Sequence, residues 1–235
     1  MMAAIHSTDG IVIQVLMIGS FVIAAIVAII GQGRAKRAER RRLLDLQSLA
    51  MRLEFDDFNP NHDEDFAQGW GFLDRLDRGN DRYAFNILRG KYHDQTLFVF
   101  DYHCQTGSGK NREEHYSTLL MLVFKAVFSQ MSIGPASLRS KIAEAFGIAN
   151  DIKFESAEFS RAFCVRSPDK KFAYDVCNPQ MIEYLLTNPG LQVEIQGPVI
   201  LLAFEPQLPA GQIEFNLQRL IEIRSRLPEY LFTNT

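Results

Sequence analysis

The sequence predicts an α+β protein, in which an N-terminal transmembrane helix is followed by a mostly antiparallel sheet with interspersed short helices. Three observations predict this class. Residues 11–30 form an apolar run without a charged side chain, and a basic stretch follows it directly. The remaining residues alternate short strand-like segments with short amphipathic helical ones, joined by turn signals typical of hairpins. This pattern favours an antiparallel arrangement over a doubly wound parallel sheet.

The apolar run has the length of a membrane span. At 1.5 Å per residue, its 20 residues give about 30 Å of helix, the thickness of a hydrocarbon core. Gln14 is its only strongly polar side chain, and a buried helix of a soluble protein would be apolar on fewer faces. A cleaved signal peptide needs positive charge before the run. Residues 1–10 carry only the terminal amine and His6, so an uncleaved anchor is favoured.

A basic collar follows the run and predicts the orientation. It consists of Arg34, Lys36, Arg37, Arg40, Arg41 and Arg42. Short flanks rich in Lys and Arg stay on the cytoplasmic side. We therefore expect a single-pass protein of the inner (cytoplasmic) membrane, with its N-terminus outside and its C-terminal domain in the cytoplasm. The collar also attracts anionic headgroups of the lipid bilayer, although a stop-transfer role accounts for it fully.

The net charge of the soluble part and a stripe of small residues in the span indicate which partners we expect this protein to bind. Residues 43–235 contain 19 Lys and Arg against 26 Asp and Glu. This acidic balance repels phosphate backbones, so nucleic acid is not an expected partner. Ser20, Ala24 and Ala28 recur every four residues, a stripe that permits close helix packing and a homo-oligomer through the membrane. Other membrane or cytoplasmic proteins are the remaining expected partners.

The chain divides into three parts: a tail and span at 1–33, the collar and a juxtamembrane amphipathic helix at 34–58, and a soluble α+β domain at 59–235. The juxtamembrane helix carries one apolar stripe, formed by Leu43, Leu46, Leu49, Ala50 and Leu53. Residues 56–65 are predicted to form a loop, and residues 66–76 a short helix.

The remaining strands and helices are predicted from the periodicity of apolar residues and from the turn-forming residues between segments. The expected strands are 84–88, 96–104, 118–127, 152–154, 162–166 and 172–176, with a turn at 89–91 between the first two. Alternation in 96–104 places Phe98, Phe100, Tyr102 and Cys104 on one face, and Asp101 and His103 on the other. A hairpin joins 191–195 to 199–204 around Gly197. The expected helices are 137–146, one opened by Asn178 and Pro179, and a closing helix at 213–227.

Three segments resemble a family of membrane-anchored bacterial proteins of unassigned function. They are LFVFDYHCQTGSGKNREEHYST, FGIANDIKFESAEFSRAFCVRS and VEIQGPVILLAF. Members resemble this chain in an apolar N-terminal anchor, a "DY.Y.TGSGK" hairpin and a closing hairpin, and the likeness covers most of residues 43–227. This chain departs at His103 and Cys104, where the pattern usually carries an aromatic residue. The resemblance implies architecture and location and supplies no activity.

The glycine-containing run at 107–110 invites a phosphate-binding interpretation. A P-loop needs a Gly five residues before its second Gly, and Ser or Thr after the Lys. Here those positions hold Cys104 and Asn111. The run also lies between two predicted strands, with no helix to direct amides at a phosphate. A hairpin loop is therefore the favoured interpretation.

No other motif predicts a metal, a cofactor or a catalytic group. The run from Asn59 to Asp65 has alternating oxygens but lacks the Gly and Glu that a calcium loop needs, and the five histidines have no ligand spacing. His103 and Cys104 point to opposite faces of their strand, so the imidazole cannot activate the thiol. We expect no cofactor and no metal.

Two function classes stay open. The favoured one is a non-catalytic interaction or scaffolding domain tethered to the membrane. The alternative is an enzyme or ligand sensor whose site is assembled around the hairpin at 101–114. Its candidate residues are Asp101, His103, Lys110, Arg112 and Glu114.

Overall fold

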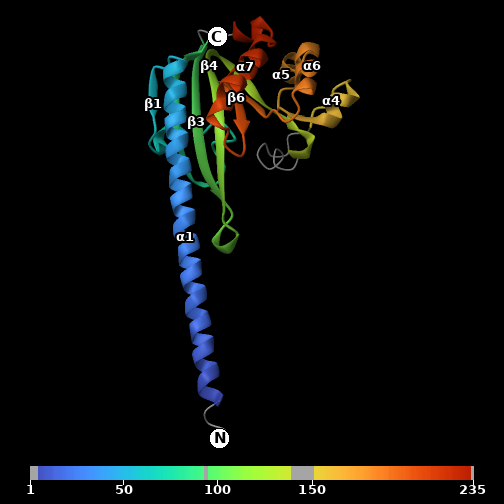
Figure 1. Cartoon of the computed structure of the whole chain (residues 1–235). Helices are drawn as coiled ribbons and strands as arrows, with labels where there is room; N and C mark the ends of the chain where they lie inside the picture. Colours follow the sequence, from blue (N-terminus) through green and yellow to red (C-terminus); the bar gives the residue numbers. More distant parts are fainter. Residues whose placement is uncertain (1–4, 93–94, 139–150, 234–235) are drawn as a thin grey trace. The chain divides into compact units, whose positions relative to one another are not determined.

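The computed structural model describes residues 5–92, 95–138 and 151–233 (Figure 1). The chain divides into two compact units, Met1–Asp45 and Leu46–Thr235, and each is described by itself. The predicted helix at 137–146 lies outside the described residues beyond position 138.

The first unit is formed by the helix α1 (Ile5–Arg52), whose last turns belong to the second unit. Within the described residues, no helix combines the length and the apolar character needed to cross a membrane. The structure describes the backbone of residues 5–26 but not their side chains. This range includes most of the predicted span, with Ser20 and Ala24. The side chain of Ala28 is not described either, so the span and its packing stripe stay predictions.

The second unit is built on a six-stranded antiparallel sheet in the order β1-β2-β3-β4-β5, with β6 pairing to β4 beside this path. Its strands are β1 (Asp57–Asn59), β2 (Asn80–Tyr92), β3 (Gln95–Thr106), β4 (Glu113–Pro135), β5 (Phe163–Arg166) and β6 (Val193–Phe204). Strands β2, β3 and β4 pair in succession, in the antiparallel arrangement that the sequence predicts. Strand β4 is long enough to pair with β3, β5 and β6.

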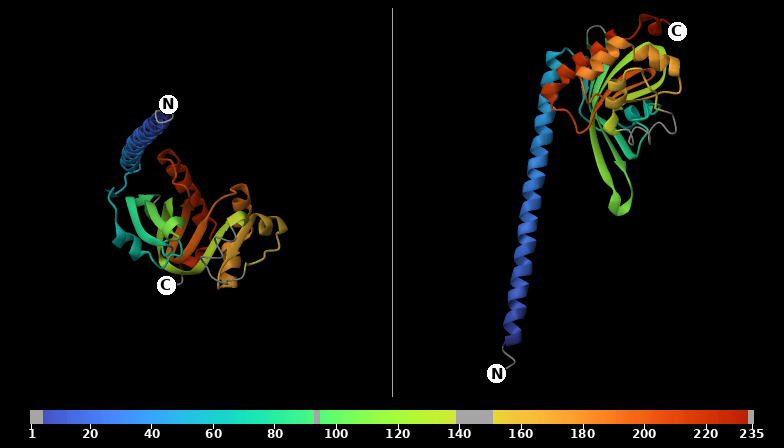
Figure 2. Two further views of the ribbon diagram at one scale, coloured as in Figure 1. Left: turned by 90° about the horizontal axis from the view of Figure 1, so that it is seen from below. Right: turned by 90° about the vertical axis from the view of Figure 1, so that its right-hand side faces the viewer.

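Short helices complete the second unit (Figure 2). They are α2 (Glu64–Gly69), α4 (Ala157–Ala162), α5 (Lys170–Val176), α6 (Pro179–Thr187) and α7 (Ala210–Ser225), with single 3-10 turns η1 (Gly109–Asn111), η2 (Ala136–Leu138) and η3 (Glu229–Phe232). Asn178 caps α6 by accepting the amide hydrogen of Met181, and Pro179 occupies its first turn. This start is the one that the sequence predicts.

Both faces of the sheet are buried. One face packs against α5, α6, α7 and the end of α1, where Leu46, Leu49 and Ala50 of the predicted stripe are buried. The opposite face packs against α2 and the segment after it, with Phe100 and Tyr102 at its centre and Phe98 and Cys104 at its border. The predicted alternation along 96–104 is confirmed.

Two predicted turns are wrong, because the glycines in them lie inside continuous strands. Residues 89–91 do not turn, since β2 continues to Tyr92. A Cβ at Gly90 would lie 3.0 Å from the amide nitrogen of Asp56, so this glycine permits close approach to the chain entering β1. That short strand pairs with β2 inside the predicted loop at 56–65.

The predicted hairpin around Gly197 is the second wrong turn. Residues 193–204 form one strand, because both flanking segments pair in succession with β4. Gly197 has a φ of +55° and lies opposite Phe128, where the register of the β4–β6 pair shifts. The glycine therefore forms a bulge, which increases local twist without ending the strand.

Two of the short predicted strands are also wrong. Residues 172–176 lie in α5, because the side chain of Asp169 accepts the amide hydrogen of Phe172 at 3.0 Å and caps a helix there. Residues 152–154 form no strand, and only an isolated bridge joins Asp151 to Arg166. The predicted strand at 162–166 is confirmed as β5.

Candidate functional site

The collar predicted from the sequence lies on α1. The side chains of Arg34, Lys36, Arg37, Arg40 and Arg41 are exposed, and that of Arg42 is half-buried. Their role at a membrane stays a prediction.

The candidate residues of the hairpin at 101–114 separate into three groups. His103 of β3 and Glu114 of β4 form one of them. The Nδ1 of His103 lies 2.9 Å from the carbonyl oxygen of Asp81, to which it donates, and its Nε2 faces the carboxylate of Glu114. Arg112 donates to the same carboxylate at 3.1 Å. The hydrogen bond from His103, and then the guanidinium of Arg112, lower the pKa of Glu114.

Asp101 lies apart from this pair and holds three strands together. It is 1% exposed. Its two oxygens accept from Asn86 of β2 at 2.9 Å and from Thr118 of β4 at 2.8 Å. The Thr118 hydroxyl in turn accepts the amide hydrogen of Leu208, in the segment before α7. A buried carboxylate that is hydrogen-bonded in this way belongs to the architecture, and it is not open to a substrate.

Lys110 forms the third group by itself. It lies in η1, at the tip of the β3–β4 hairpin, and makes no hydrogen bond or ion pair with a described residue. The chain passes from a strand through a single 3-10 turn to the next strand. The hairpin interpretation of residues 107–110 is therefore confirmed.

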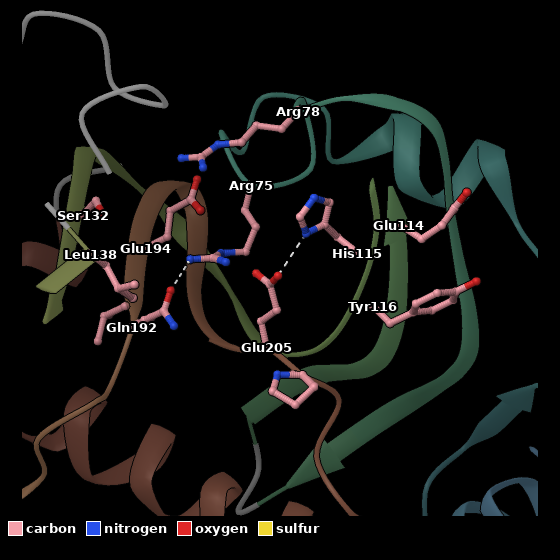
Figure 3. Close-up of a pocket in the computed structure, with 12 residues that line it drawn as sticks. Arg75, Arg78, Glu114, His115, Tyr116, Ser132, Leu138, Gln192, Glu194 and Glu205 are labelled. Atoms are coloured by element: carbon pink, nitrogen blue, oxygen red, sulfur yellow. Dashed lines mark hydrogen bonds and ion pairs between the residues drawn. The ribbon is translucent and has the colours of Figure 1, made fainter. Parts of the chain in front are cut away.

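A cavity of about 460 Å³ lies beside this hairpin (Figure 3). Its wall is formed by the segment after α2, the start and the end of β4, η2, and both ends of β6. The lining residues are Arg75, Arg78, Glu114, His115, Tyr116, Ser132, Leu138, Gln192, Val193, Glu194, Glu205 and Pro206. Only Glu114 of these belongs to the candidates that the sequence suggests.

One line of hydrogen bonds at the cavity joins a hydroxyl, an imidazole and a carboxylate. The Thr106 hydroxyl lies 2.8 Å from His115 Nε2, and His115 Nδ1 lies 3.0 Å from the Glu205 carboxylate. Sequence reasoning missed this group. Thr106 and His115 flank the hairpin and could have been proposed as cross-strand neighbours. Glu205 follows β6, 90 residues later than His115, and no local pattern points to it.

Glu194 is the buried carboxylate of the cavity. It is 5% exposed and accepts the amide hydrogen of Asp74 at 2.7 Å. Burial, together with the charge of the Asp74 carboxylate and against the opposing effect of Arg75, raises the pKa of Glu194 to about 7. This carboxyl group therefore changes its charge near neutral pH. Among the described residues, no three His, Cys, Asp or Glu side chains are placed to hold a metal ion.

Cys104 should react slowly with thiol reagents. It is half-buried among the residues that pack under α2, and burial, then the charge of Glu205, raises its pKa. Its thiolate fraction at pH 7.5 is therefore low, and labelling with a disulfide reagent should be at least about tenfold slower than that of a free thiol. Cys104→Ala should remove this slow phase, because Cys164 and Cys177 are buried. Rapid labelling that His103→Asn slows would contradict this expectation and indicate an activated thiolate.

The fold and the site define an α+β domain with a curved antiparallel sheet and a polar cavity beside its central hairpin. No protein-family model matches the chain, and no curated protein matches it in sequence. The chain is similar to the crystal structure of the mycobacterial trehalose monomycolate transport factor A, TtfA, with a TM-score of 0.56 and 18% sequence identity. The alignment covers 81% of this chain and 96% of that one. At this identity the likeness is one of fold.

Proposed function

We propose that this chain is a membrane-anchored, non-enzymatic accessory factor that assists the transport of a lipid or glycolipid, with its folded domain in the cytoplasm. The observation that carries the proposal is the fold likeness to TtfA, which covers 96% of that chain and whose name describes a transport factor. The apolar run at 11–30, followed by the basic collar, supports the anchor and its orientation. The resemblance to membrane-anchored bacterial proteins of unassigned function agrees with it.

The arrangement of the hairpin candidates also favours an accessory role. Asp101 is hydrogen-bonded to Asn86 and Thr118. His103 is hydrogen-bonded to the Asp81 carbonyl oxygen and to Glu114. A general acid or base must reach a reacting group, and these side chains are already engaged by structural partners. A scaffold that binds other membrane or cytoplasmic proteins makes no such demand.

The orientation can be tested with reporters fused after Thr235. A reporter that is active only in the cytoplasm should be active there, and one that is active only outside should be silent. Changing Arg40, Arg41 and Arg42 to Gln should shift a measurable share of molecules to the reverse orientation, because the Lys and Arg bias sets topology. The control changes Lys91, Lys125 and Arg161, which are exposed on the folded domain, and should leave the orientation unchanged. Recovery of a secreted, truncated domain would exclude the anchor.

The accessory role can be tested by depletion and complementation in the source cell. Radiolabelled precursors should show that depletion changes where a membrane lipid accumulates, while its total synthesis stays the same. Variants of the polar hairpin such as His103→Asn and Thr106→Ala, checked for folding, should restore the distribution fully. A change in lipid synthesis itself, with no rescue by these folded variants, would indicate an enzyme.

A second candidate function, hydrolysis of an ester, is favoured by one observation. The Thr106–His115–Glu205 line has the order of nucleophile, base and orienting acid found in hydrolytic triads. The purified full chain should then hydrolyse p-nitrophenyl acetate and lose this activity in both Thr106→Ala and His115→Ala. Equal rates in the wild type and both variants would leave the accessory role as the better account.

A further inference from the structure

Two arginine side chains enter the same cavity from one short segment. Arg75 and Arg78 both belong to the chain between α2 and β2, and both line the cavity (Figure 3). The two ends of β6 also line it, with Gln192 and Glu194 at one end and Glu205 just after the other. Both arginines therefore line a hollow of about 460 Å³, which is large enough for a small ligand.

The hydrogen-bonding capacity of these two groups is only partly used. Arg75 donates to the Oε1 of Gln192 at 2.8 Å, while its Nε is buried and has no hydrogen-bond partner. Arg78 makes no hydrogen bond or ion pair with any described residue, and its Nε is buried as well. Buried donors without partners are uncommon in folded proteins. Burial, opposed by the charge of Glu194, lowers the pKa of Arg75, which indicates how strongly the site disfavours an unpaired charge.

Three neighbouring carboxylates accept hydrogen bonds from groups other than Arg75 and Arg78. Glu205 is bonded to His115, and Glu114 to His103, Gln105 and Arg112. Asp74 accepts from Gln130 at 2.8 Å. Each of these acids is thus engaged by another group of the protein.

Glu194 is the remaining acid, and it lies near both arginines in Figure 3. It forms no ion pair with either of them, and one of its oxygens accepts the amide hydrogen of Asp74. Since this carboxyl group is protonated in part of the molecules near neutral pH, it balances less than one of the two positive charges. The cavity therefore keeps unused N–H donors on both arginines.

We propose that this cavity binds the oxyanion group of a small ligand, a phosphate, through the guanidinium groups of Arg75 and Arg78. The planar fork of Arg matches the oxygens of a phosphate group and forms paired charge-assisted hydrogen bonds with it. The hydroxyl of Ser132, which is buried at the same wall, supplies a further donor. The phosphate comes either from free inorganic phosphate or from the headgroup of a phosphate-bearing lipid, and both sources share this recognition chemistry.

Calorimetric titration of the full chain in a non-ionic detergent tests the proposal. One arm uses inorganic phosphate, and the other uses the water-soluble short-chain lipid dihexanoyl phosphatidic acid. Dihexanoyl phosphatidylcholine, whose phosphate is a diester in a zwitterionic headgroup, is the control for the lipid arm. Arg78→Gln should weaken binding by at least about tenfold, as expected when a hydrogen bond between charged groups is lost. The matched control Arg161→Gln removes the same charge from an exposed position on α4 and should change the affinity by less than about twofold.

Arg75 is tested with a variant that keeps its charge. Arg75→Lys loses the planar fork, and we expect it to weaken binding while circular dichroism shows an unchanged fold. Preference for inorganic phosphate identifies a soluble ligand, and preference for the phosphatidic acid identifies a lipid headgroup. The absence of binding by the wild type in both arms would overturn the proposal. So would binding that Arg78→Gln and Arg161→Gln weaken equally.

Discussion

Phe100→Ala is expected to lower the free energy of unfolding by about 3–5 kcal/mol, as is usual when a buried aromatic side chain is truncated. Phe100 is 1% exposed at the centre of the core under α2. Its ring meets that of Phe66 edge to face, with 5.1 Å between the centroids. The variant loses the transfer free energy of the ring and leaves a cavity that the strands on either side cannot fill. Urea unfolding followed by tryptophan fluorescence measures the change, because Trp70 borders the same core.

The matched control is Phe215→Ala. This ring lies on α7 and is 62% exposed, and its described aromatic contact is the guanidinium of Arg219 at 4.9 Å from its centroid. We expect a loss of less than about 1 kcal/mol. A loss for Phe100→Ala as small as that for Phe215→Ala would mean that the alternation along β3 does not place Phe100 in the core. Since whole domains are stable by about 5–15 kcal/mol, Phe100→Ala should also reduce the yield of folded protein.

Glu194→Gln is expected to stabilise the protein at alkaline pH and to have little effect in acid. Burial raises the pKa of Glu194 from 4.5 to about 7, so the folded state holds this proton more tightly than the unfolded chain. The stability that the group contributes is present in full below about pH 4.5, and it is lost as the pH rises towards 7 and beyond. A difference of this size corresponds to about 3 kcal/mol. Gln resembles the protonated acid, and its variant avoids the loss.

Urea unfolding of the wild type and the variant between pH 4.5 and 8 measures this difference. The two curves should nearly coincide at pH 4.5 and separate to about 3 kcal/mol at pH 8. Glu183→Gln, at an exposed position of α6, removes the same charge and should show no such separation. A difference for Glu194→Gln that is constant across the pH range would show that the carboxyl group is ionised throughout.

Local signals predicted those parts of the fold that depend on neighbouring residues. Asn178 and Pro179 start α6 because a cap and a first-turn proline act within one turn. The faces of β3 follow from alternation, which needs no knowledge of the partner strands. The prediction failed where a glycine had two possible roles. Gly197 permits a turn or a bulge, and only the continuous pairing of β6 with β4 decides between them.

The site was harder to predict because distant segments assemble it. Glu114 was suggested from the hairpin, but Arg75, Glu194 and Glu205 reach the cavity from two segments that lie more than 100 residues apart in the sequence. Asp101 and His103 share a face of β3, as predicted, yet their partners assign them different roles. Asp101 joins β2 to β4, and His103 faces Glu114. A sequence gives the face of a strand more readily than the side chain that lies opposite.

The pairing of β4 with β6 has a consequence for the chain during its synthesis. Residues 118–133 of β4 pair with residues 193–204, which the ribosome adds some 70 residues later. Until then this edge of β4 presents unpaired N–H and C=O groups, and such edges can pair with another chain. The amide of Leu208 also reaches the Thr118 hydroxyl only after β6 is complete. Nascent chains that end before residue 193 should therefore be the aggregation-prone species, and these are the chains that a ribosome-bound chaperone would have to protect.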